Sequence, residues 1–119
     1  MNRGSEFTDL TRCQVEALLE CFDFLDNGYQ DMGTYNFDDV AIHRLRHKTK
    51  GTWIKVISRP ESYDVYKERK LRKSVMLVDN MSRYRLFVNS DMSVGVVRTS
   101  PGADVGLIPD SLSTNNDAR

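Results

Sequence analysis

The chain has 119 residues, which is enough for one domain and too few for two. Hydrophobic residues make up 39% of it, and no apolar run approaches the roughly 20 residues that a membrane-spanning helix requires. Lys and Arg together number 17, Asp and Glu also number 17, and there are two cysteines, so a polycation, an acidic tail and a disulfide scaffold are excluded.

The start of the chain has the composition of an expression scar. Gly4-Ser5-Glu6-Phe7 matches what two adjacent cloning sites encode. We therefore interpret residues 1–7 as a scar and leave them out of the fold prediction. On this interpretation the chain is a domain excised from a larger protein. No apolar stretch follows Arg3, so the opening lacks the pattern of a secretory signal.

Residues 11–26 are predicted to form an amphipathic helix. Apolar side chains recur there at spacings of three and four residues, which brings them to one helix face: Val15, Leu18, Leu19, Phe22 and Leu25. Thr11, with Gln14 three residues later, is the pattern of a capping box at the helix start. Gly28 after Asn27 supplies a left-handed stop.

The segment after the helix is expected to pass from a loop into a hairpin. Residues 29–39 have a loop composition with aromatic anchors, and Tyr35 and Phe37 are expected to tuck under the core. Residues 40–47 fit either a short helix or a strand. We favour the strand, because a turn and a second arm within residues 48–58, rich in β-branched and aromatic side chains, would complete a hairpin.

Beyond residue 58 the pattern changes. Pro60 is expected to end the strand within residues 48–58, because proline lacks the backbone N–H that a sheet hydrogen bond needs. Residues 61–73 are charged and mixed, and they fit a short helix or an exposed extension of the next strand. Three short apolar runs joined by four-residue polar turns then predict an antiparallel meander over 75–78, 84–88 and 94–97. Residues 99–119, punctuated by Pro and Gly and then polar, are predicted to be a flexible tail.

The charge is segregated along the chain although it sums to zero. Residues 1–42 carry two basic and nine acidic side chains, for a net charge of −7. Residues 43–73 carry eleven basic and three acidic side chains, for a net charge of +8. Residues 74–119 carry four and five, for a net charge of −1. A positive block of this density predicts a surface that attracts carboxylates or phosphates.

We interpret residues 43–73 as a partner-binding segment. Its cations and interleaved aromatic residues are the candidate binding residues: Arg44, Arg46, Lys48, Lys50, Trp53, Lys55, Arg59, Tyr66, Lys67, Arg69, Lys70, Arg72 and Lys73. Arg44 and Arg46 alternate with other residues, so in a strand they would project from one side. Trp53 is expected beside Lys55 on the outer face of its strand, because the opposite arrangement would bury Lys55. There it is either an exposed candidate binding hot spot or a residue covered by a second layer, such as the helix or the tail.

Other interpretations of this segment stay open. The acidic helix would neutralise the cations internally, or the cations would lie on an edge strand and discourage sheet-to-sheet aggregation. A bound partner would be an acidic protein or a nucleic acid. Base stacking on Trp53 or Tyr66 would favour DNA or RNA, and the zero net charge argues against it. A head-to-tail homo-oligomer, acidic helix against basic segment, is a further alternative.

No motif predicts catalysis, a metal ion or a cofactor. His43 and His47 are four residues apart and share a face, but zinc needs at least a third ligand. Cys13 and Cys21 would lie about 12 Å apart on the helix, too far for a disulfide, so we expect two reduced, buried thiols and an intracellular location in cytoplasm or nucleus. There is no nucleophile elbow, P-loop or dinucleotide fingerprint, so we expect no enzyme and no cofactor.

Together these patterns predict one α+β domain over residues 8–98. An N-terminal helix would pack on an antiparallel sheet of four or five strands, ahead of the flexible tail. The helix stripe is expected to meet strand residues Ile54, Val56, Leu77, Leu86, Val88 and Val96. The expected function is a non-enzymatic interaction module whose basic segment binds an acidic partner, with nucleic-acid binding or self-assembly as the alternatives.

Overall fold

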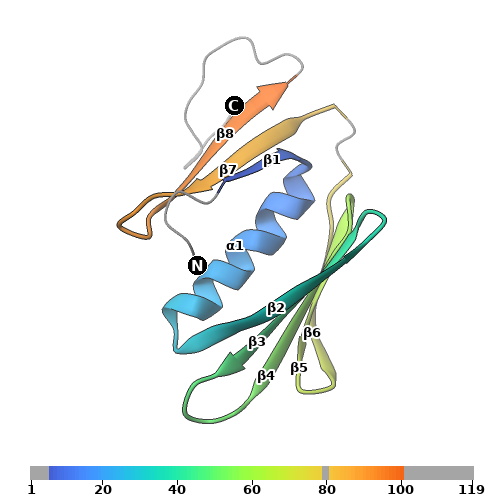
Figure 1. The fold of residues 1–119 in the computed structure, drawn as a ribbon. Coiled ribbons are helices and arrows are strands. Elements are labelled where there is room, and N and C mark those ends of the chain that lie inside the picture. Colours follow the sequence, from blue (N-terminus) through green and yellow to red (C-terminus); the bar gives the residue numbers. More distant parts are fainter. Residues whose placement is uncertain (1–5, 79–80, 101–119) are drawn as a thin grey trace. The chain divides into compact units, whose positions relative to one another are not determined.

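The chain combines one helix with two antiparallel sheets in the part of the chain that the structure describes (Figure 1). This structure is a computed structural model, and it describes residues 6–78 and 81–100. The predicted α+β class is therefore confirmed. The described residues form two compact units, one within Cys13–Val78 and one made of the segments on either side of it.

Helix α1 spans Arg12–Asp26, within one residue of the predicted range. It ends where the backbone N–H of Asn27 donates to the carbonyl of Phe24, at 2.9 Å, and the Asn27 side-chain amide donates to the carbonyl of Asp23, at 2.7 Å. Gly28 follows with a φ of +94°, a left-handed conformation that glycine adopts without steric cost. The predicted stop signal therefore acts as expected.

The larger sheet is a five-stranded meander in which each strand pairs with its neighbour in sequence, in the order β2-β3-β4-β5-β6. Its strands are β2 (Tyr29–Phe37), β3 (Val40–His47), β4 (Trp53–Ser58), β5 (Ser62–Lys67) and β6 (Lys70–Met76). The hairpin of β3 and β4 is the one that the sequence favoured, and the helical alternative for residues 40–47 is wrong. Figure 1 shows the five strands side by side, from β2 in teal to β6 in yellow-green.

The predicted loop at residues 29–39 is wrong, because most of that segment is strand β2. The turn-forming residues that suggested a loop are absorbed in a bulge, where the register shifts between Asp31 and Thr34. Within it, Gly33 has a φ of +110° and donates its N–H to the Asp31 carboxylate at 2.9 Å. A bulge places extra residues in one strand without ending the pairing.

Residues 61–73 form no helix. The predicted extension of the next strand holds from Lys70, the start of β6, whereas residues 62–67 are the separate strand β5. A tight turn joins the two strands, and Glu68 has a φ of +59° in it. This left-handed residue is not glycine, which is why the turn was hard to recognise from sequence.

The smaller sheet has the order β1-β7-β8, with β1 at Glu6–Leu10, β7 at Arg83–Val88 and β8 at Val94–Ser100. The antiparallel pairing of the second and third predicted runs is confirmed, but the three-run meander is wrong. Val75 belongs to β6 of the larger sheet, and β7 pairs with β1 instead. Glu6 and Phe7, set aside with the predicted scar, are the residues that pair with Phe87 and Leu86.

A buried cluster combines small side chains of α1 with larger ones of the sheet. Its members are Cys13, Ala17, Cys21, Leu45, Ile54, Val56, Tyr63 and Val65. The three helix members recur every fourth residue, so they share one helix face. The predicted stripe contributes little to this cluster. Leu25 packs against it, Val15 and Leu18 are buried outside it, and Leu19 is 39% exposed.

Three of the strand residues that were expected to meet the helix belong to the smaller sheet. Leu86, Val88 and Val96 lie on the strands of the smaller sheet and not on the sheet that holds Ile54 and Val56. The predicted tail begins too early, because β8 continues to Ser100; residues 101–119 lie outside the described part. The boundaries 8–98 for a single domain stay a prediction. No helix in the described ranges is long and apolar enough to cross a membrane.

Candidate functional site

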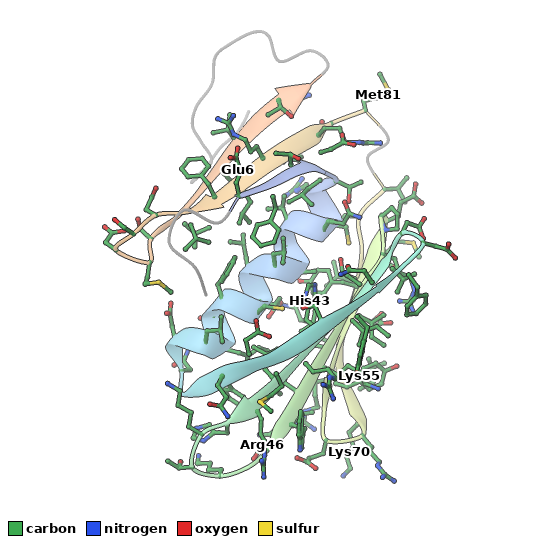
Figure 2. All side chains as sticks on the ribbon, in the orientation of Figure 1. Glu6, His43, Arg46, Lys55, Lys70 and Met81 are labelled. Atoms are coloured by element: carbon green, nitrogen blue, oxygen red, sulfur yellow. The ribbon has the colours of Figure 1, made fainter. Side chains whose placement is uncertain are left out.

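The two faces of the five-stranded sheet differ in chemistry. Side chains alternate between the faces along each strand, and cross-strand partners share a face. The inner face holds buried side chains such as Leu45, Ile54 and Val65. The other face, here called the outer face, is lined in its basic part by alternate residues of β3 to β5: Arg44, Arg46, Trp53, Lys55 and Tyr66. Tyr35 of β2 lies on the same face, in the neighbouring row opposite Ile42. Figure 2 labels Arg46 and Lys55 on this sheet.

Arg44 is the centre of the outer face. Its guanidinium lies 4.9 Å from the ring centroid of Tyr35 and 5.7 Å from that of Trp53. One nitrogen, Nη2, donates to the backbone carbonyl of Met32 at 3.1 Å. The β2 bulge supplies this acceptor, because Met32 and Gly33 lie in the stretch where the register shifts opposite Arg44. The guanidinium is thereby held between two rings, and its Nε is buried without a hydrogen-bond partner.

Two further cation–ring pairs extend the pattern. Arg46 lies 5.6 Å from the Trp53 ring centroid, and its Nε donates to the Gly51 carbonyl at 3.5 Å. Lys55 lies 5.7 Å from the Tyr66 ring centroid. Exposed cation–ring contacts of this kind contribute about 0.5–1 kcal/mol each. They orient the cations while leaving most of their donors toward solvent.

Arg44 and Lys55 are directly opposite each other in the β3–β4 register. Like charges at such a position are destabilising, by up to about 1 kcal/mol. Within residues 6–78 and 81–100, no carboxylate forms an ion pair with Arg44, Arg46 or Lys55. The outer face therefore concentrates positive charge that these residues do not neutralise.

Other cations of the predicted binding segment are neutralised. Lys73 pairs with Glu20 of α1, and the Tyr63 hydroxyl donates to the same carboxylate at 3.0 Å. Burial, and then this carboxylate, raises the pKa of Tyr63. Arg59 pairs with Asp64 at 3.0 Å. A hydrogen bond from Ser74, and then Arg59, lowers the pKa of Asp64. Internal neutralisation by the acidic helix thus applies to Lys73 and does not extend to the outer face.

The remaining predicted site residues lie at the ends of the strands. Lys48 and Lys50 are exposed in the β3–β4 turn, where the Lys50 N–H donates to Nδ1 of His47 at 3.1 Å. The β5–β6 hairpin and the start of β6 carry four exposed cations: Lys67, Arg69, Lys70 and Arg72. The structure therefore brings together Arg44, Arg46, Trp53, Lys55 and Tyr66, and it separates the other predicted residues from them.

Tyr35 is the outer-face residue that the sequence analysis missed. Tyr35 and Phe37 were expected under the core, and that expectation is wrong because they are 56% and 53% exposed. The signal was present in the sequence. Phe37 and Val40 flank the two-residue turn of Asp38 and Asp39, and Tyr35 then pairs with Ile42 on the same face. Trp53 lies on the outer face near Lys55, as predicted.

The histidines and cysteines are held in the fold itself. His43 lies on the inner face, with Nδ1 3.1 Å from the Thr34 hydroxyl, and burial lowers its pKa. Cys13 and Cys21 are free and buried, as predicted, and burial raises the pKa of Cys21 to about 12. A thiol with so high a pKa is a poor nucleophile at neutral pH. In the described ranges, no group of three metal-ligating side chains could hold an ion.

Comparison with known proteins does not supply a relative. No protein-family model matches the chain, and neither a curated protein nor a solved structure matches it.

Proposed function

We propose that this chain is a non-enzymatic interaction module whose outer face binds an acidic segment of another protein. The observation that carries the proposal is the cross-strand pair of Arg44 and Lys55, two cations directly opposite each other with no described carboxylate between them. A carboxylate bound between these side chains would replace a repulsion by two attractions. The relief of this repulsion therefore contributes favourably to the free energy of binding.

The surroundings of the pair favour a bound carboxylate. Arg44 is oriented by two rings and by the Met32 carbonyl, so little side-chain entropy remains to be lost when its free N–H groups donate to an anion. Arg46 and Lys55 are exposed on the same face and provide further donors. Charge-assisted hydrogen bonds from a guanidinium to a carboxylate are among the stronger polar contacts in proteins.

An acidic protein fits this face better than a nucleic acid does. Bases would have to stack on Trp53 and Tyr66, and cations already lie over both rings. A carboxylate needs only the edge of the guanidinium and leaves these contacts in place. The net charge of zero also gives little long-range attraction for a phosphate backbone, since domains that bind nucleic acids are often strongly basic.

The proposal includes two finer points. We infer that α1 covers the inner face of the five-stranded sheet, an inference supported by the cluster of Cys13, Ala17 and Cys21 with Leu45 and Val56. The outer face is then the side available to a partner. We further propose an intracellular location, supported by two cysteines that are both free.

Replacement of both central cations tests the proposal. The double variant Arg44→Gln/Lys55→Gln is compared with Arg85→Gln/Arg98→Gln, which removes the same charge from the smaller sheet. The probe is a fluorescein-labelled peptide of alternating Glu and Ser, and binding is measured by fluorescence anisotropy. We expect the first variant to weaken binding about tenfold, which corresponds to the loss of one or two charge-assisted contacts, and the control to weaken it less than about twofold. Binding of the unaltered chain should also weaken with added salt.

Three results would count against the proposal. One is no binding of the peptide even at low salt. Another is equal loss in both double variants, because the charge would then act without regard to position. The third is tighter binding of a single-stranded oligothymidine than of the peptide, which would favour a nucleic-acid partner instead. Thermal unfolding of both variants separates loss of binding from loss of fold.

A further inference from the structure

The outer face is divided along its strands into a basic part and an apolar part. Next to the cross-strand row of Arg44, Lys55 and Tyr66 lies a row in which Tyr35, Ile42 and Ile57 are paired. On β5 this row ends at Asp64, whose carboxylate is already held by Arg59 and Ser74. Beyond it, at the tip of the β2–β3 hairpin, Phe37 pairs with Val40. The polarity thus changes within a few residues along the same two strands.

The side chains of the apolar part belong to no described core cluster, and part of their surface is exposed. Phe37 is 53% and Tyr35 is 56% exposed, and Val40, Ile42 and Ile57 are half-buried. These side chains point away from the face that carries Leu45 and Val56. Scattered apolar side chains on a surface are ordinary, but a contiguous apolar patch with a polar rim is typical of a docking site.

We infer, on the basis of the proposed function, that the partner segment carries an apolar anchor next to its carboxylates, and that Phe37, Ile42 and Ile57 receive this anchor. Charge complementarity selects an acidic polypeptide for the basic part, and the adjoining apolar part requires a side chain that a phosphate backbone does not have. A polypeptide offers both chemistries in one short segment.

The strand geometry sets the spacing in the partner. Successive side chains on one face of a strand are about 7 Å apart, so Ile42 lies about 7 Å from Arg44 and about 13 Å from Arg46 along β3. An extended partner segment running along β3 has the same period. Its anchor and its two carboxylates would therefore occupy alternate positions, in the pattern apolar-x-acid-x-acid or its reverse.

Peptides that differ only in the anchor test this inference. The probes are the alternating Glu and Ser peptide, the same peptide with Leu at one end of the alternating series, and the same peptide with Leu at the other end. The protein variants are Phe37→Ser/Ile57→Thr, which removes the apolar part, and Met92→Ser, a control at an apolar residue that is 51% exposed outside the larger sheet. Anisotropy titrations measure binding, and thermal unfolding verifies the fold of each variant.

We expect one of the two Leu peptides to bind the unaltered chain about tenfold more tightly than the acidic peptide, the effect of burying about half of a leucine side chain. In Phe37→Ser/Ile57→Thr this gain should disappear while binding of the acidic peptide persists. In Met92→Ser the gain from Leu and the binding of the acidic peptide should both persist. Arg44→Gln/Lys55→Gln should weaken all three peptides.

The inference and the proposed function fail in different ways. If the acidic peptide does not bind, the proposed function is wrong, and the anchor has nothing to adjoin. If the acidic peptide binds but Leu adds nothing at either end, or if its gain survives Phe37→Ser/Ile57→Thr, the inference is wrong and the proposed function stands. A concentration-dependent dimer that Phe37→Ser/Ile57→Thr abolishes would instead identify a second copy of the chain as the occupant.

Discussion

A half-buried imidazole on the inner face makes the stability of the fold depend on pH. Burial lowers the pKa of His43 from its ordinary value of 6.5, and the charge of Asp31 opposes this shift in part. The unfolded chain therefore takes up the proton at a higher pH than the folded chain does. Well above pH 6.5 both forms are neutral. As the pH falls through that value the unfolded form takes up its proton first, which favours unfolding until the folded form also titrates.

We predict that the free energy of unfolding falls between about pH 7.5 and about pH 5.5, and that His43→Gln makes this fall shallower. Glutamine keeps a polar group near the Thr34 hydroxyl and has no proton to gain. Urea unfolding followed by circular dichroism across this range measures the slope. An unchanged slope in the variant would assign the pH dependence to other groups.

At the scale of the residue, the sequence predicted much of the candidate site. Arg44, Arg46 and Lys55 were chosen for their charge, and Trp53 was placed correctly because a buried Lys55 would be costly. Which cations stay unpaired was not predictable, since the carboxylate that Lys73 meets, Glu20, lies 53 residues away in sequence. Tyr35 was missed because its strand was missed.

At the scale of the element, strands with regular alternation were predictable and strands with irregularities were not. The β3–β4 hairpin has uninterrupted pairing from Ala41 to Arg46, and its sequence pattern was sufficient. Strand β2 contains a bulge at Gly33, and a left-handed Glu68 joins β5 to β6. The bulge breaks the period of two on which strand prediction depends, and the turn at Glu68 lacks the glycine or asparagine that marks a tight hairpin turn.

The bulge in β2 gives a prediction about the candidate site. Gly33→Ala places a Cβ at a φ of +110°, and we expect it to lower the free energy of unfolding by about 1–2 kcal/mol. It should also weaken binding of the acidic peptide, because the Met32 carbonyl that holds Arg44 lies in the same bulge. Asn36→Ala, an exposed position on the same strand, serves as the control. Full retention of stability and binding in Gly33→Ala would mean that the bulge does not position Arg44.

At the scale of the whole chain, the sequence predicted the class and not the number of sheets. Once residues 1–7 had been set aside, the run at 84–88 lacked its partner β1, and the adjacent run at 75–78 took its place in the predicted meander. Local patterns identify strands, but pairing between segments almost 80 residues apart is decided by long-range contacts that no local window contains.

The pairing of β1 with β7 can be tested by shortening the chain. Deletion of residues 1–10 removes a strand that pairs along β7 and leaves Leu86, which is fully buried, beside an unpaired edge. Relative to deletion of residues 1–5, which serves as the reference, we expect a loss of roughly 2 kcal/mol in the free energy of unfolding, because Phe7 and Leu10 are half-buried and each loses part of its burial. Urea denaturation measures the difference.

Exposure of the β7 edge should also increase aggregation, since an unpaired strand edge is a template for pairing with another chain. Equal stability and equal solubility of the two shortened chains would show that the smaller sheet does not need its first strand.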